Sequence, residues 1–351
     1  MTKRLLVNFA RVGDMVMQVP MLRHLSRSGQ IDLLTRPWGR KLLAGQAWMG
    51  TVHTLARPYK GHTFPSSLWY GGELATMRAT MIAEHYDEVL MFNEFPKFAQ
   101  WVSGWAGLKL HALDARALAG RVPHAVDLNR AALETAGYDV NGYEDRPRLD
   151  VPAPNLAMAQ ARLAPLGKRV IAVQAGSSLT HRWFRKQPNL KGIPAERWAA
   201  LVGGIIRRGE ADAAVLHGSA PEGREARAIR AALPAEIRGK VHDWTGKAPL
   251  GELPALFAAH SALLSVDTGP AHIAAAVGCP LLVLFGPSDP AKWLPRGPGK
   301  VVPMVGSAPC QFCMDTSLFK KCRANVCLTS VTAATYDRAW QRLIAPVPAP
   351  G

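Results

Sequence analysis

The sequence lacks any apolar run long enough to cross a membrane, because none reaches the roughly 18 residues that a span requires. The apolar stretch that follows Lys3 and Arg4 is too short for a secretory signal, and Arg11 and Asp14 come soon after it. We therefore expect a protein that stays in the cytoplasm. Helix-turn-helix, zinc-finger and aromatic ribonucleoprotein signatures are also lacking, so we expect no nucleic-acid partner.

Acidic residues are scarce relative to basic ones: 26 Asp and Glu stand against 42 Lys and Arg, giving a net charge of +16 over 351 residues. A positive field attracts anionic partners. The charge therefore indicates a phosphorylated or acidic substrate, or an anionic membrane surface, without naming one. The length is comfortable for two domains.

Strands and helices alternate in two series, separated by a proline-rich connector at 146–154. Each series predicts a parallel sheet with crossover helices, and hence an α/β fold. We expect a first domain over 1–150, a second over 151–330, and a C-terminal helix and tail over 331–351. Segment 57–72, rich in Pro, Gly and aromatic residues without periodicity, predicts a long surface loop. The expected strands are 4–9, 31–35, 88–92, 169–174, 213–217, 240–242, 262–266 and 280–285.

The stretch from 262 to 285 reads as a buried strand, a tight polar turn, a helix and a second strand. This places Asp267, Thr268 and His272 at the carboxyl end of a parallel strand, where open α/β folds bind ligands. The helix start there would present backbone N–H groups and a positive dipole to a phosphate. The plainer interpretation, in which Asp267 and Thr268 only cap the helix, stays open.

Other turns after expected strands carry polar residues with two interpretations each. Asp14 is either a helix cap or a general base. Ser177 and Ser178 form either a plain turn or a close contact to phosphate. Lys191 is a solvated lysine or a positive charge for a diphosphate. Glu222 is favoured at a helix start in any case, and could also accept a hydrogen bond from a ribose hydroxyl.

Four of the five cysteines are spaced Cys310-x2-Cys313-x8-Cys322-x4-Cys327. In a cytosolic chain, two close pairs favour a tetrahedral thiolate metal site over disulfides. A reduced, metal-free, cysteine-rich loop is the alternative. The fifth, Cys279, stands at the start of an expected strand, and we expect it to be buried.

Several segments resemble the ADP-heptose:lipopolysaccharide heptosyltransferases, glycosyltransferase family 9. Phe9-Ala-Arg-Val-Gly-Asp-Met-Val-Met-Gln-Val-Pro20 is similar to the N-terminal motif of that family, and Lys191-x-x-Pro-x-Glu-x-Trp198 to a central one. Asp243-Trp-Thr-Gly-Lys-Ala-Pro-Leu250, Asp267-Thr-Gly-Pro-Ala-His272 and Phe285-Gly-Pro-Ser-Asp-Pro290 are similar to its C-terminal signature. The resemblance runs from about residue 4 to 343.

The resemblance implies a GT-B fold, with two Rossmann-like doubly wound domains facing a central cleft. It also implies an inverting, metal-independent transfer of heptose or a related sugar from ADP-heptose to a lipopolysaccharide core at the inner membrane surface, with no cofactor for catalysis. Asp14 would be the base. Carried over to donor binding are Ser177 and Ser178 with Lys191 for the diphosphate, Glu222 for the ribose, and Asp267, Thr268, Gly269 and His272 for phosphate and sugar.

The chain departs from the family pattern in places. Asn8 replaces a common basic residue, and the segment between Ser178 and Lys191 is long, so Arg182 or Lys186 could replace Lys191. The cysteine tail resembles the metal finger of autotransporter heptosyltransferases, which modify proteins. Such an enzyme, with structural zinc or iron on the four cysteines, is one alternative function, and a non-catalytic nucleotide- or RNA-binding protein is another. Candidate acceptor contacts in the first domain are Arg57, Lys60, Arg121 and His124.

Overall fold

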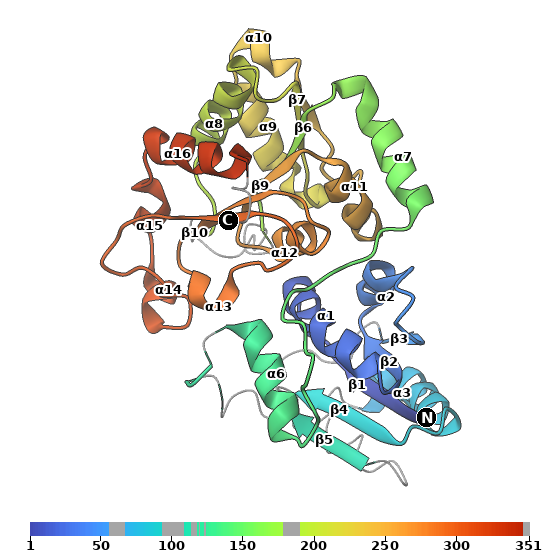
Figure 1. Ribbon diagram of the computed structural model, residues 1–351. Coiled ribbons are helices and arrows are strands. Elements are labelled where there is room, and N and C mark those ends of the chain that lie inside the picture. Colours follow the sequence, from blue (N-terminus) through green and yellow to red (C-terminus); the bar gives the residue numbers. More distant parts are fainter. Residues whose placement is uncertain are drawn as a thin grey trace. The chain divides into compact units, whose positions relative to one another are not determined.

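The protein is described by a computed structural model over residues 1–55, 67–92, 109–113, 118, 120–122, 124–177 and 190–346. The chain forms two compact units, Met1–Pro147 and Arg148–Gly351, and the division falls inside the proline-rich connector. Each unit has its own sheet with helices around it (Figure 1). All the strand pairings in the described residues are parallel, which confirms two Rossmann-like α/β domains.

The sheet of the first unit is built around the N-terminal strand. Its order is β3 (Val52–Thr54), β2 (Gly29–Thr35), β1 (Thr2–Val7), β4 (Glu88–Phe92) and β5 (Lys109–Leu113). Its helices are α1 (Val12–Ser26), α2 (Pro37–Leu43), α3 (Ser67–Ala83) and α6 (Ala125–Thr135). The helix α1 follows β1 closely and is buried along most of its length, because its residues are apolar on nearly every side. Its first turn therefore lies at the carboxyl edge of this sheet.

A buried polar network is centred on Asp32 of β2. Asp32 is fully buried, and its carboxylate accepts hydrogen bonds from the Tyr86 hydroxyl at 2.7 Å, the Thr51 amide at 2.8 Å and the Gln30 side chain at 2.9 Å. The Tyr86 hydroxyl in turn lies 3.0 Å from His53 Nε2. Burial and the hydrogen bond to Asp32 raise the pKa of Tyr86. The network is satisfied internally, as a buried carboxylate requires.

The second unit contains a six-stranded sheet. Its order is β11 (Val301–Val305), β10 (Leu281–Phe285), β9 (Ala262–Val266), β6 (Val170–Gln174), β7 (Ala213–Leu216) and β8 (Val241–Asp243). Its helices are α7 (Ala153–Leu163), α8 (Ala195–Arg207), α9 (Gly223–Ala232), α10 (Ala235–Arg238), α11 (Leu253–Ala259), α12 (Gly269–Ala276), α13 (Pro290–Trp293), α14 (Ser317–Lys321), α15 (Val326–Thr329) and α16 (Ala333–Ile344). From β6 the chain adds β7 and β8 on one side of the sheet, and then β9, β10 and β11 on the other side. The neighbouring strands β6 and β9 are therefore the topological switch point of a doubly wound sheet.

Helices cover both faces of this sheet (Figure 1). Alternate strand residues point to opposite faces, so Ile171 and Val173 pack with α8, α9 and α16, while Val170 packs with Leu163 of α7. The largest buried side chains on the first face are Trp198 and Trp340, each about 1% exposed. Burying one such ring contributes roughly 3 kcal/mol or more, so α16 is an integral part of this unit.

Two buried histidines of the second unit, His217 and His260, lie in contact with each other. Val170 O accepts from His260 Nδ1–H at 3.0 Å, so His260 Nε2 is an acceptor and faces His217 Nε2–H at 3.0 Å. Burial lowers the pKa of both rings, that of His260 to about 4. Both rings are therefore neutral at pH 7.

Most expected elements are confirmed, and some expectations are wrong. The loop predicted over 57–72 is helical from Ser67, and Gly71 and Gly72 lie inside α3; residues 56–66 lie outside the described residues. Glycine costs a helix only about 1 kcal/mol, which the following helix-forming residues outweigh. The strands β3, β5 and β11 are not among the expected ones. The last contains Pro303, which is tolerated because β11 is an edge strand. Within the described chain, no helix has the length and apolar character needed to cross a membrane.

Candidate functional site

The candidate site is built at the carboxyl edge of β6 and β9. The strands are parallel and adjacent, with Gln174 paired to Ser265, so the turns that follow them emerge side by side. The β6 turn carries Gly176 and Ser177, and the β9 turn carries Asp267 and Thr268. This is the edge of an open α/β sheet at which ligands bind.

A buried ion pair joins this edge to the segment before α8. Lys191 Nζ lies 2.6 Å from the carboxylate of Asp267 and donates to the Asp267 carbonyl at 3.2 Å. The two side chains are only 11% and 7% exposed. The structure thus brings together two residues 76 positions apart, and it places a positive charge at the switch point.

The ionised form of Asp267 is stabilised by this environment. Burial alone would raise the pKa of its carboxyl, but the charges of Lys191 and His272 and the hydrogen bond from Lys191 outweigh burial, and the pKa is lowered. Ser288 also contributes to the lowering. Asp267 is therefore ionised at neutral pH and fixes the position of the lysine.

The helix α12 starts beside this pair. Thr268 is its N-cap residue in extended backbone conformation, but the Thr268 side chain makes no capping hydrogen bond. Gly269 and Pro270 form the first turn, and His272 is buried within the next. Thr268 thus holds the cap position, as the plainer interpretation expected, but without a side-chain hydrogen bond. The N–H groups and positive dipole of this eight-residue helix are directed to the same edge as Lys191.

Glu222 reaches the same edge from the β7 side. It is 7% exposed, and its carboxylate accepts from the Ser219 amide at 2.5 Å, the Ser219 hydroxyl at 2.7 Å and Gln174 Nε2 at 3.1 Å. A Cβ atom on Gly176 would lie 2.4 Å from a carboxylate oxygen of Glu222. Glycine at position 176 thus provides the space that Glu222 occupies.

Of the remaining residues predicted to bind the donor, the structure describes only some. Ser177 is 4% exposed and follows Gly176 directly. Ser178, together with the alternatives Arg182 and Lys186, lies outside the described residues. Lys191 lies against Asp267, and the choice between it and the two alternatives stays a prediction.

Asp14 belongs to the first unit, at the carboxyl edge of its sheet. It is the third residue of α1, not its cap, and its half-buried carboxylate accepts from the Arg11 amide at 3.0 Å. A carboxylate in a helix first turn is stabilised by the dipole. This contact uses one carboxylate oxygen, and it is a contact that an asparagine could also make.

The predicted acceptor contacts differ in accessibility. Arg121 is exposed, whereas His124 is 5% exposed and caps α6, its Nδ1 accepting from the Val126 amide at 3.2 Å. Arg57 and Lys60 lie outside the described residues. Arg121 thus has the exposure that an acceptor contact needs, and the observed role of His124 is to begin a helix.

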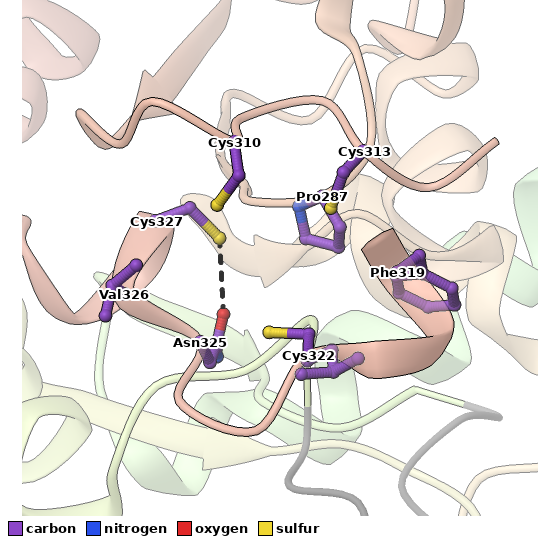
Figure 2. A pocket seen from close by; sticks show the side chains of 9 residues that line it. Pro287, Cys310, Cys313, Phe319, Cys322, Asn325, Val326 and Cys327 are labelled. Atoms are coloured by element: carbon purple, nitrogen blue, oxygen red, sulfur yellow. Dashed lines mark hydrogen bonds between the residues drawn. The ribbon is translucent and has the colours of Figure 1, made fainter. Parts of the chain in front are cut away.

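All four C-terminal cysteines line one small cavity of about 20 Å³ (Figure 2). Pro287 and Asn325 are also among its lining residues. Cys313 and Cys327 are buried, and burial, followed by the nearby thiols, raises the pKa of Cys327 to about 11. Among the described residues, no three His, Cys, Asp or Glu side chains are arranged so that they could hold a metal ion. The expectation for Cys279 is confirmed, since it is 2% exposed.

Sequence reasoning missed three residues of this region. Gln174 positions Glu222, Ser288 lies at Asp267, and Asn325 donates to the Gly192 carbonyl at 2.7 Å. Ser288 stands in the Phe285-Gly-Pro-Ser-Asp-Pro290 segment, which was a usable signal. Nothing local marks Asn325, because its partner is 133 residues away.

Two Rossmann-like units, each with its own parallel sheet, have the architecture of the GT-B fold. The structure of E. coli ADP-heptose lipopolysaccharide heptosyltransferase II superposes with a TM-score of 0.71 at 20% identity, covering 97% of this chain and 98% of that one. The E. coli heptosyltransferase WaaC with ADP gives a TM-score of 0.68 at 20% identity, covering 97% and 99%. These similarities confirm the fold class.

The family follows from the sequence. A model of glycosyltransferase family 9 (heptosyltransferase) matches residues 90–322, more than half of the chain. The chain therefore belongs to that family and is a glycosyltransferase. It is 28% identical over 313 residues to lipopolysaccharide heptosyltransferase 2 of Salmonella typhimurium, covering 82% of this chain and 84% of the relative.

Proposed function

We propose that this enzyme transfers a heptose from ADP-heptose to a lipopolysaccharide core acceptor, with inversion at the anomeric carbon. The observation that carries the proposal is the buried Lys191–Asp267 pair beside the start of α12, in a chain of family 9. The names of the relatives support ADP-heptose as donor and lipopolysaccharide as acceptor. They also favour a lipopolysaccharide acceptor over a protein acceptor.

The donor is bound by the second unit. Lys191 and the N–H groups of α12 hold the diphosphate, together with Ser177 and Ser178. Glu222, at the same edge of the sheet, accepts a hydrogen bond from a ribose hydroxyl. Asp267 keeps Lys191 extended toward the site, and Thr268, Gly269 and His272 contact the phosphate and sugar.

The reaction is a single displacement. Asp14 removes the proton from the acceptor hydroxyl as its oxygen attacks the anomeric carbon. The bond between that carbon and the diphosphate oxygen breaks on the opposite face, and ADP leaves with the electron pair. Negative charge that grows on the diphosphate is stabilised by Lys191 and the α12 dipole, so we propose that catalysis needs no metal ion.

The chain as a whole is basic, which is in keeping with an acidic acceptor. A net charge of +16 suits an acceptor that carries phosphates and acidic sugars at an anionic membrane surface. We therefore place the enzyme on the inner face of the inner membrane, with Arg57, Lys60, Arg121 and His124 on the acceptor side. Sedimentation with vesicles tests this: binding to anionic vesicles that falls with salt supports the placement, and equal binding to neutral vesicles contradicts it.

Asp14→Asn tests the catalytic assignment. Asparagine can still accept from the Arg11 amide, so this contact at the helix start is kept while the basicity is lost. We expect ADP affinity to be unchanged and transfer to fall by about 10² to 10⁴-fold. Retained turnover would rule out Asp14 as the base. If the unaltered protein binds ADP but transfers no sugar, it is instead a non-catalytic binding protein.

A thermal-shift screen with ADP-, UDP-, GDP- and dTDP-sugars tests the donor. Stabilisation by ADP-heptose above the others is expected, because a ligand that binds the native state raises its stability. A shift with a UDP-sugar and none with ADP-heptose would overturn the donor assignment. Transfer measured with and without EDTA tests the metal-independent chemistry, which we expect to be insensitive to the chelator.

We further propose that Cys310, Cys313, Cys322 and Cys327 bind a structural zinc or iron ion. Thiolates are preferred ligands of both metals, and the cavity has room for about one water-sized particle. The four side chains would have to close inward to coordinate it. Metal analysis of reduced protein is expected to give one equivalent, which is lost in Cys310→Ser with Cys313→Ser. No zinc or iron in the unaltered protein would leave only a cysteine-rich loop.

A further inference from the structure

Asn325 occupies an unusual position in the cysteine-rich loop, between Cys322 and Cys327. Its backbone lies in the left-handed region with φ 47°, which asparagine tolerates better than most residues. Its side chain is nonetheless buried, at 5% exposure. A buried side-chain amide needs hydrogen-bond partners inside the protein, so the contacts of Asn325 are informative.

Two hydrogen bonds orient the Asn325 amide. The Gly192 carbonyl accepts from Nδ2 at 2.7 Å, and the Cys327 thiol lies 3.4 Å from Oδ1, toward which it donates (Figure 2). Because a carbonyl oxygen can only accept, the bond to Gly192 by itself fixes which end of the amide faces that backbone, whether Cys327 is a thiol or a metal-bound thiolate. Asn325 therefore links the cysteine-lined cavity to the residue that follows Lys191.

The segment that carries Lys191 has few secondary-structure bonds of its own. Lys191 and Gly192 lie in a turn and irregular backbone before α8, whose first residue is Ala195. Leu190 lines the same cavity as the cysteines, and Arg197 of α8 donates to the Val331 carbonyl at 2.8 Å. The loop 322–331 thus contacts the segment 190–197 on both sides of Gly192.

We propose that Asn325 is a positioning residue for the donor-binding lysine. By holding the Gly192 carbonyl, it fixes the backbone from which Lys191 reaches Asp267, and it makes the cysteine loop a support for the diphosphate site. The proposal rests on the role of Lys191 in donor binding given above. It extends that role by naming what holds the lysine.

Asn325→Gly is the informative variant. Glycine adopts φ 47° without strain, so the backbone is preserved while the amide bridge is lost. Arg197→Ala is the matched control, because it removes another side-chain bond to a carbonyl between the same two segments, five residues beyond Gly192. ADP affinity is measured by calorimetry for both variants, alone and combined with Lys191→Met, well below each melting temperature.

We expect Asn325→Gly to weaken ADP binding by roughly fivefold, the value of one hydrogen bond, and Arg197→Ala to leave it unchanged. In the Lys191→Met background, Asn325→Gly should have no further effect, because there is no lysine to position. The KM for donor should rise with little change in kcat. A merely structural role would not produce this dependence on Lys191.

Two results would overturn the inference, and they are distinct from failure of the proposed function. If Lys191→Met weakens ADP binding but Asn325→Gly does not, Asn325 positions nothing at the donor site. If Asn325→Gly weakens binding equally with and without Lys191, it acts by another route. If Lys191→Met leaves ADP binding unchanged, the donor assignment of Lys191 is wrong, and the inference falls with it.

Discussion

Replacing Lys191 with methionine tests how much the Lys191–Asp267 ion pair at the switch point contributes to the free energy of unfolding. Methionine keeps most of the length and the apolar character of the lysine stem but removes the charge 2.6 Å from Asp267. Asp267 would be left 5% exposed without its main counter-charge. Removing one partner of a buried pair is strongly destabilising, because the remaining charge is uncompensated.

The expected cost is about 3 kcal/mol, at the lower end for buried pairs because Lys191 is still 11% exposed. For a unit the size of Arg148–Gly351, this corresponds to a fall of roughly 6–12 °C in melting temperature. The contribution of Asp267 to the pH dependence of the unfolding free energy should change sign in Lys191→Met. In the unaltered protein the pKa of Asp267 is lowered, so stability is lost as pH falls through it. In Lys191→Met, burial dominates and raises that pKa, so stability is lost as pH rises through it.

Differential scanning calorimetry at several pH values measures the melting temperature of the second unit, because the transitions of two units can be separated. Lys191→Met with Asp267→Asn should recover most of the loss, since it leaves no buried charge. Lys292→Met is the control: its ion pair with Asp315 is exposed, and its removal should change the unfolding free energy by less than about 0.5 kcal/mol. If Lys191→Met resembles the control, or Asp267→Asn fails to rescue it, the pair is not a buried, coupled one.

Three further predictions concern other parts of the molecule. The pKa of His260, lowered to about 4, should cost the second unit up to roughly 3 kcal/mol as pH falls from 6.5 to 4, and His260→Gln should flatten that decline in calorimetric scans. Gly176→Ala should weaken ADP binding by roughly tenfold in calorimetric titration, because its Cβ displaces the Glu222 carboxylate; unchanged affinity would separate Glu222 from donor binding. Tyr86→Phe should lower the unfolding free energy of the first unit by about 1–3 kcal/mol in denaturant titrations, because the buried Asp32 loses a donor; an unchanged midpoint would show that water replaces it.

Much of the fold could be predicted because its signals are local. Strands such as Ala262–Val266 and Leu281–Phe285 are short apolar runs bounded by turn residues, and the connector near Pro147 is marked by composition. The errors fall where a local rule competes with context. Pro303 argues against a strand until the strand is known to lie at an edge, and Gly71 argues against a helix until the length of α3 is known.

The site was predictable only as separate turns. That Asp267 ends a strand can be read locally, but that Lys191 reaches it depends on how α8 packs against the sheet. The bridge from Asn325 to Gly192 joins residues whose neighbours give no hint of each other. The four cysteines are a partial exception, since their spacing alone favoured one common site, and all four line one cavity.

The central claim is the transfer of heptose from ADP-heptose, and the most direct measurement is the mass of the acceptor after reaction. Purified enzyme is incubated with ADP-heptose and a heptose-deficient lipopolysaccharide core, with Asp14→Asn in parallel. The account predicts acceptor heavier by one heptosyl residue and an equal amount of ADP with the unaltered enzyme, and neither with Asp14→Asn. Acceptor of unchanged mass with the unaltered enzyme, or equal conversion by Asp14→Asn, would contradict it.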